Sequence, residues 1–132
     1  MQSMSPVPAA AVVDLVLVLL FVVIGRSSHG EQLSPGGFFA TFWPFLVALA
    51  AGWAVARAWR RPLAIWPTGV VIWIVTVIVG MLLRIVAGQG VQLAFVVVAT
   101  LVLGAFLVGW RVVLEVIDRR STRPSYRRPG RR

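Results

Sequence analysis

Long apolar stretches separated by short polar segments make up most of this chain. Four of them cover roughly residues 9–25, 38–56, 63–86 and 91–116. A helix that crosses a bilayer needs about 20 mostly apolar residues, and about 17 can suffice. Each stretch is therefore long enough to span a membrane. The pattern predicts an all-α fold, a polytopic transmembrane four-helix bundle.

The four stretches leave almost no chain for a soluble domain. We expect one transmembrane domain over residues 1–118, followed by a basic tail over residues 119–132. The tail combines arginine with serine, threonine, proline and glycine, and it has too few apolar residues to bury a core. It is therefore predicted to be a disordered cytoplasmic segment.

Composition agrees with a membrane protein and narrows the chemistry. Hydrophobic residues make up 59% of the chain, more than in a typical soluble domain. The chain has no cysteine and one histidine, so no disulfide, thiolate or metal site is predicted. We expect no cofactor, and a multi-pass location in the cytoplasmic membrane.

The distribution of arginine predicts the orientation. The net charge of +9 is carried by arginine, because the chain has no lysine. Arg57, Arg60 and Arg61 follow the second stretch, on the same side of the membrane as the basic tail. The opposite side has only Arg26 and Arg84 near the ends of its spans. Cytoplasmic loops carry the excess of basic residues, so both termini are predicted to be cytoplasmic.

Basic residues beside a membrane span favour anionic lipid headgroups as the partner, and we expect no nucleic acid. In the tail this prediction concerns five arginines in particular: Arg119, Arg120, Arg123, Arg127 and Arg128. The alternative is that these residues only fix the topology.

Small residues recur at four-residue spacing on three of the predicted helices, at Ala48, Gly52 and Ala56, at Thr76 and Gly80, and at Ala105 and Gly109. Such spacing lets helix backbones approach closely in lipid. One interpretation is a compact bundle within one chain. The other is a face that forms a homo-oligomer or docks a larger membrane complex.

Most of the six tryptophans fall near the ends of the predicted spans: Trp43, Trp53, Trp59, Trp66 and Trp110. This placement is typical of an aromatic belt at the membrane interface. Trp73 lies deeper and is the exception.

Two charged residues lie within predicted spans at similar depth. Asp14 is on the first helix and Arg111 is on the fourth. Intramembrane charges cost about 2.5–3.5 kcal/mol on insertion scales and usually find a partner. We therefore predict an Asp14–Arg111 ion pair. A proton- or ion-coupling role for Asp14 is the functional alternative.

A second polar group is predicted at the opposite membrane face. Arg26 and His29 follow the first helix, and Arg84 ends the third. Guanidinium groups bind phosphate or carboxylate bidentately. We predict an anionic-ligand or lipid-headgroup site, with Thr76 and Gly80 lining a groove for an apolar chain. The alternative is that the arginines reach the interface with Glu31 as counter-ion.

Several motifs occur together in the order Asp14, Phe21–Gly30, Trp43–Phe45, Gly80–Arg84 and Gly109–Arg111. With them the chain resembles a family of small four-helix integral membrane proteins, mainly actinobacterial and haloarchaeal, known only as a domain of unknown function. The resemblance implies a fold and a membrane location but no activity. It also implies that Asp14, Arg26, His29, Arg84 and Arg111 matter as a set.

Function is the least determined property. Hydrolases and metalloenzymes need paired acids, a nucleophile with a base, or a ligand cluster, which four acids and one histidine do not supply. We therefore expect a non-enzymatic accessory protein or a membrane protein that binds lipid or another anionic ligand. The alternative is a small transporter or channel, which at four helices would need to oligomerise.

Overall fold

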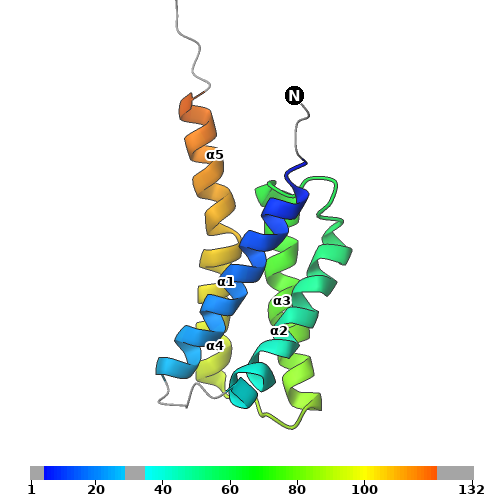
Figure 1. The fold of residues 1–132 in the computed structure, drawn as a ribbon, viewed down its shortest axis with the longest axis vertical. Coiled ribbons are helices and arrows are strands. Elements are labelled where there is room, and N and C mark those ends of the chain that lie inside the picture. The colour runs from blue at the N-terminus through cyan, green and yellow to red at the C-terminus, as the bar shows by residue number, and fades with distance from the viewer. Residues whose placement is uncertain (1–4, 29–34, 122–132) are drawn as a thin grey trace, which may run out of the picture.

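The computed structural model describes residues 5–28 and 35–121, and within these ranges the chain forms only helices and turns (Figure 1). The elements are α1 (Val7–Ser28), α2 (Pro35–Ala56), the short η1 (Ile65–Gly69), α3 (Val70–Val86), α4 (Leu93–Leu107) and α5 (Gly109–Ser121). Four segments are long and apolar enough to cross a membrane: Val7–Arg26, Gly36–Ala56, Ile65–Val86 and Leu93–Ser121. The predicted all-α fold with four spans is confirmed.

The third span does not begin as a regular helix. The prediction placed the start of the span near Leu63, and the span begins at Ile65, but its regular helix α3 begins only at Val70. In η1, Trp66 has extended backbone angles (φ −119°, ψ 132°) and precedes Pro67 through a cis peptide. A residue before proline is disfavoured in the α conformation, and proline cannot donate a backbone hydrogen bond. The Trp66-Pro67 pair therefore delays the regular helix.

The fourth span is interrupted at Val108 and continues as α5 to Ser121. This end lies beyond the predicted boundary, so Arg119 and Arg120 are helical and do not belong to a disordered tail. An ion pair one helical turn apart, Arg119 to Glu115 at 2.7 Å, supports the extension. Basic residues at a helix C-terminus also interact favourably with the helix dipole.

Figure 1 shows how the helices are arranged. Helix α1 crosses in front of the bundle, with α4 on one side and α2 on the other, and α3 lies behind. The start of α1, the α2–η1 connection and the end of α5 lie at one end of the molecule. The α3–α4 turn lies at the opposite end. We call these the terminal end and the turn end.

Small residues allow the helices to approach closely. A Cβ atom at Gly52 of α2 would lie 3.1 Å from the carbonyl oxygen of Ile72 of α3. A Cβ atom at Gly80 would lie 2.8 Å from the ring of Phe45. Ala105 and Gly109 make no such close approach within the chain, because Ala105 is exposed and no atom lies within 4 Å of a Cβ at Gly109.

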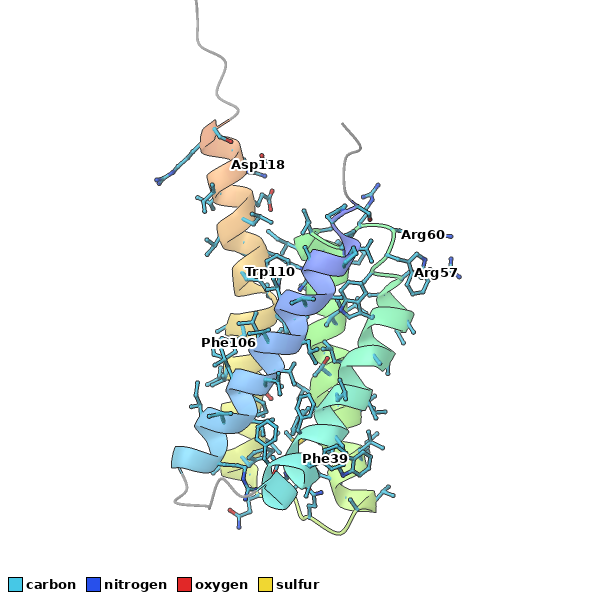
Figure 2. The ribbon with its side chains drawn as sticks, in the orientation of Figure 1. Phe39, Arg57, Arg60, Phe106, Trp110 and Asp118 are labelled. Carbon is cyan, nitrogen blue, oxygen red and sulfur yellow. The ribbon has the colours of Figure 1, made fainter. Side chains whose placement is uncertain are left out.

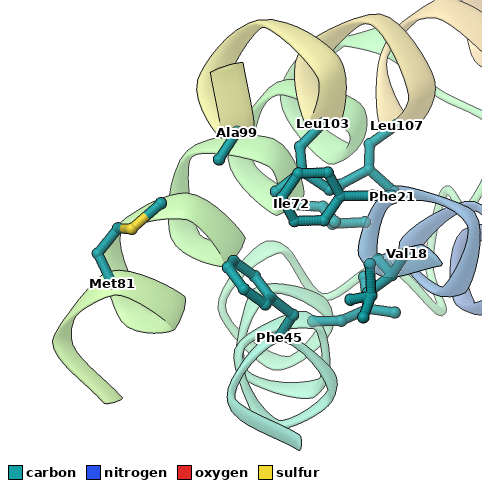
Figure 3. Close-up of a cluster of buried hydrophobic side chains, with 11 residues drawn as sticks. Val18, Phe21, Phe45, Ile72, Met81, Ala99, Leu103 and Leu107 are labelled. Carbon is teal, nitrogen blue, oxygen red and sulfur yellow. The ribbon is translucent and has the colours of Figure 1, made fainter. Parts of the chain in front are cut away.

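The apolar core lies where α1, α2, α3 and α4 meet (Figure 3). Phe21 and Phe45 pack edge to face, with their ring centroids 5.2 Å apart. Ile72, Leu103 and Leu107 are fully buried around them. Many large apolar side chains on the outer helix faces are exposed instead, as expected for surfaces that contact lipid.

Candidate functional site

The first polar site lies inside the bundle near its terminal end and is built around Asp14. Its carboxylate accepts hydrogen bonds from both terminal nitrogens of Arg111, at 3.0 Å (Nη1) and 2.8 Å (Nη2). It also accepts one from the indole Nε1 of Trp53 and one from that of Trp110, each at 2.9 Å. Asp14 and Arg111 are both fully buried.

Arg111 also binds two backbone carbonyls. Its Nε donates to the oxygen of Pro62 at 2.9 Å, and its Nη1 donates to the oxygen of Leu107 at 2.7 Å. In an uninterrupted helix the Leu107 oxygen would accept from the backbone N–H of Arg111. The guanidinium takes that oxygen at the point where the helix is interrupted, at Val108.

Gly69 makes room for this guanidinium. A Cβ atom at Gly69 would lie 3.0 Å from Cδ of Arg111. The hydrogen bonds described above join α1, α2, the α2–η1 connection and α5 through four side chains: Asp14, Arg111, Trp53 and Trp110. We call this group the Asp14 cluster.

The geometry of the Asp14 cluster indicates a structural role. An ionised carboxylate has about four acceptor positions, and four donors occupy them. Among the described residues no group of three or more His, Cys, Asp or Glu gathers that could hold a metal ion. The hydrogen-bond partners of Asp14 among the described residues are one guanidinium and two indoles.

The second polar site is a cavity of about 310 Å³ at the turn end of the bundle. Arg26 of α1 and Arg84 of α3 both line it. We call it the two-arginine cavity. The rest of its lining is small, apolar or uncharged: Phe21, Val22, Gly25, Gly37, Ala40, Thr41, Gln89 and Phe95.

Pro44 explains how Arg84 is positioned. Because proline has no N–H, Pro44 leaves the oxygen of Ala40, four residues earlier, without its usual helical donor. The side-chain nitrogen of Gln89 donates to this oxygen at 2.7 Å. The side-chain oxygen of Gln89 accepts from Nη1 of Arg84 at 3.2 Å. The guanidinium also lies over the ring of Phe95, 4.4 Å from its centroid.

Arg26 is positioned from the other side of the cavity. Its Nη1 donates to the hydroxyl of Thr41 at 2.8 Å, and that hydroxyl donates to the oxygen of Gly37 at 3.2 Å. Two guanidiniums from different helices therefore converge on one small cavity with aromatic walls.

The predicted site residues divide into three groups. Asp14 meets Arg111, and Arg26 and Arg84 share a cavity. Thr76 does not belong to that cavity, because it is fully buried and faces Gly52 of α2. Arg119 and Arg120 lie exposed at the end of α5, and the other predicted residues lie outside the described ranges, namely His29, Glu31, Arg123, Arg127 and Arg128.

Sequence reasoning missed Trp53, Trp110 and Gln89. The two indoles were assigned to the aromatic belt, although they lie at the depth of Asp14. A buried carboxylate needs more donors than one arginine supplies, and this need was the available signal. Gln89 could have been found from Pro44, since a proline within a helix frees a carbonyl.

A family model described as a protein of unknown function (DUF3054) matches residues 11–114, which is most of the chain. The match includes the Asp14 cluster and every residue that lines the two-arginine cavity. Neither a curated protein nor a solved structure matches the chain.

Proposed function

The chain belongs to this family of unknown function, and we propose that it is a non-enzymatic membrane protein that binds an anionic group in the two-arginine cavity. The observation that supports this proposal is the convergence of Arg26 and Arg84 on one cavity of about 310 Å³. A phosphate or carboxylate is the chemistry that two guanidiniums recognise best, because it accepts paired N–H bonds from each.

The cavity favours the anionic group of an amphiphile. Ligand pockets are usually apolar with a few placed polar groups, and this volume is at the lower end of their range. The rings of Phe21 and Phe95 and the side chain of Val22 form an apolar wall beside the two guanidiniums. We expect a headgroup to bind the two arginines and its apolar chain to lie beside these apolar residues.

The sequence-based proposal of a groove along Thr76 and Gly80 is not part of this function. Phe45 packs against Gly80, and Thr76 is buried between α3 and α2. An apolar chain would therefore leave the cavity sideways toward lipid and would not run down the bundle interior.

Native mass spectrometry of the purified protein tests the binding. Protein mixed with phosphatidylglycerol or with neutral phosphatidylcholine should retain the anionic lipid preferentially. Arg26→Gln and Arg84→Gln should each lower that retention about tenfold or more, because a hydrogen bond to a charged group is worth about 1.5–3 kcal/mol. Arg120→Gln removes an exposed arginine at the terminal end and is the matched control. It should lower the retention far less than either cavity variant, because exposed charge pairs are weak.

Two further arms identify the source of the anion. Inorganic phosphate alone should displace the lipid if only the anionic group is recognised, and should fail to do so if the apolar chain contributes. Glu31→Gln tests the alternative that the arginines use Glu31 as their counter-ion, and should leave lipid retention equal or stronger. Equal retention in the unmodified chain and in both arginine variants would contradict the proposed site.

Orientation is a second part of the proposal. We infer from the arginine distribution that both termini are cytoplasmic. A reporter fused after Arg132 should therefore be active only in its cytoplasmic form, and one fused after Val86 of a shortened chain should be active only outside. The reverse pattern would place the two-arginine cavity at the cytoplasmic face.

A further inference from the structure

A groove of about 620 Å³ lies at the terminal end, between α5 and the residues around η1. One wall is apolar and consists of Leu63, Ala64, Ile65 and Trp66, and the other consists of Leu114, Glu115 and Asp118 on α5. Trp66 is 71% exposed. Both charged residues that line the groove are acidic, although the chain has only four acidic residues in total.

The opposite flank of the same end is basic. Arg57, Arg60 and Arg61 are exposed there and line a small pocket at the α2–η1 connection. Trp59, between them, is 53% exposed. In Figure 2, Arg57 and Arg60 lie on one edge of the molecule and Asp118 on the other. The two flanks are therefore complementary in charge, and both present an exposed aromatic ring.

We propose that copies of this chain associate head to tail in the membrane, with the Arg57–Arg61 segment of one copy in the acidic groove of the next. Guanidinium binds carboxylate bidentately, so these arginines match Glu115 and Asp118. Trp59 would lie against the apolar wall that contains Trp66. A contact between two different surfaces generates a ring when the rotation closes.

The height of the two flanks supports a second copy as the partner. The bond from Arg111 to the oxygen of Pro62, 2.9 Å long, fixes α5 to the chain between Arg61 and Leu63. The base of the groove, at Leu63, therefore lies at the level of the basic segment, and Glu115 and Asp118 lie about one and two helical turns further along α5. Copies inserted in the same direction are related by rotation about the membrane normal, which keeps that level. Anionic lipid could bind the arginines but would be repelled by the two carboxylates of the groove.

The internal partner of Glu115 does not block this contact. Arg119 binds Glu115 at 2.7 Å, and their side chains are 79% and 41% exposed. Exposed pairs of this kind are weak. A guanidinium from a second copy can therefore compete for the carboxylate.

The absence of cysteine from the chain allows a direct test. The double variant Trp59→Cys/Leu114→Cys, treated in membranes with a short thiol cross-linker, should give a ladder of dimers and higher oligomers. Each single variant should give none, because a head-to-tail contact does not bring one residue against itself. Dimers from Leu114→Cys alone would show that α5 pairs with itself, and would overturn the proposal.

Charge exchange provides the specificity control. In the double-cysteine background, Asp118→Arg and Arg60→Glu should each reduce the ladder severalfold, and the two together should restore it. Arg120→Glu, on α5 but outside the groove, should leave it unchanged. A ladder insensitive to charge would overturn the proposal, and so would cross-links only within one chain or no cross-links at all. A shortened variant that ends at Ser121 provides the last check. A ladder that forms in this variant but not in the full chain would also overturn the proposal.

Discussion

Replacing Asp14 by Asn, or Arg111 by Gln, should destabilise the protein by about 3–5 kcal/mol, because each leaves a charged partner buried. Asn is a severe change at this position, since its amide would direct N–H groups at the indole and guanidinium donors. The double variant should lose less than the sum of the two, with a coupling energy of about 0.5–3 kcal/mol. The free energy of unfolding of all three variants can be measured by circular dichroism in mixed detergent.

The exposed Glu115–Arg119 pair is the matched control for this cycle. It is the same kind of ion pair at 2.7 Å, but its side chains are 41% and 79% exposed. Its coupling in the cycle Glu115→Gln/Arg119→Gln should be about 0.3–0.5 kcal/mol at most. If the Asp14–Arg111 cycle were additive in the same way, the pair would contribute nothing beyond its separate residues.

Replacing Gly80 by Ala should cost about 1–3 kcal/mol of stability, as expected for overpacking. The new methyl group would lie 2.8 Å from two atoms of the Phe45 ring. Phe45 is fully buried and packs edge to face on Phe21, so the ring cannot move aside without disturbing α1 as well. The unfolding midpoint in mixed detergent should fall accordingly.

Gly25→Ala is the control for this substitution. Gly25 is also helical, but nothing lies within 4 Å of a Cβ placed there. Alanine should leave stability unchanged or raise it by about 0.5–1 kcal/mol, because glycine is the poorer helix former. Equal losses at both positions would mean that the contact with Phe45 is not the cause.

Hydropathy predicted the spans well because the bilayer imposes their length. Predicted and observed ends differ by no more than two residues, apart from the last end of the fourth span. Hydropathy could not show the interruption at Val108. The interruption coincides with a hydrogen bond from the Arg111 side chain to the backbone oxygen of Leu107. Every residue has the same backbone oxygen, so the sequence does not show which one a side chain will bind.

Charge and depth were enough to bring Asp14 and Arg111 together in the prediction, because a buried charge requires a partner. Charge and depth did not place Thr76 correctly, because the prediction put it on the same helix face as Arg84. Successive residues in an α-helix are rotated by about 100°, so positions eight apart differ by about 80°. Thr76 consequently faces α2, while Arg84 reaches the two-arginine cavity.

The Asp14 cluster also has a consequence during synthesis. Asp14 and Arg111 are 97 residues apart. At about 5–20 residues per second, the ribosome needs roughly 5–20 s between them. During that interval α1 carries the Asp14 carboxylate before its ion-pair partner Arg111 has been synthesised. The buried carboxylate gains this partner only when α5 is made. The Asp14 cluster therefore forms only once Arg111 has been translated.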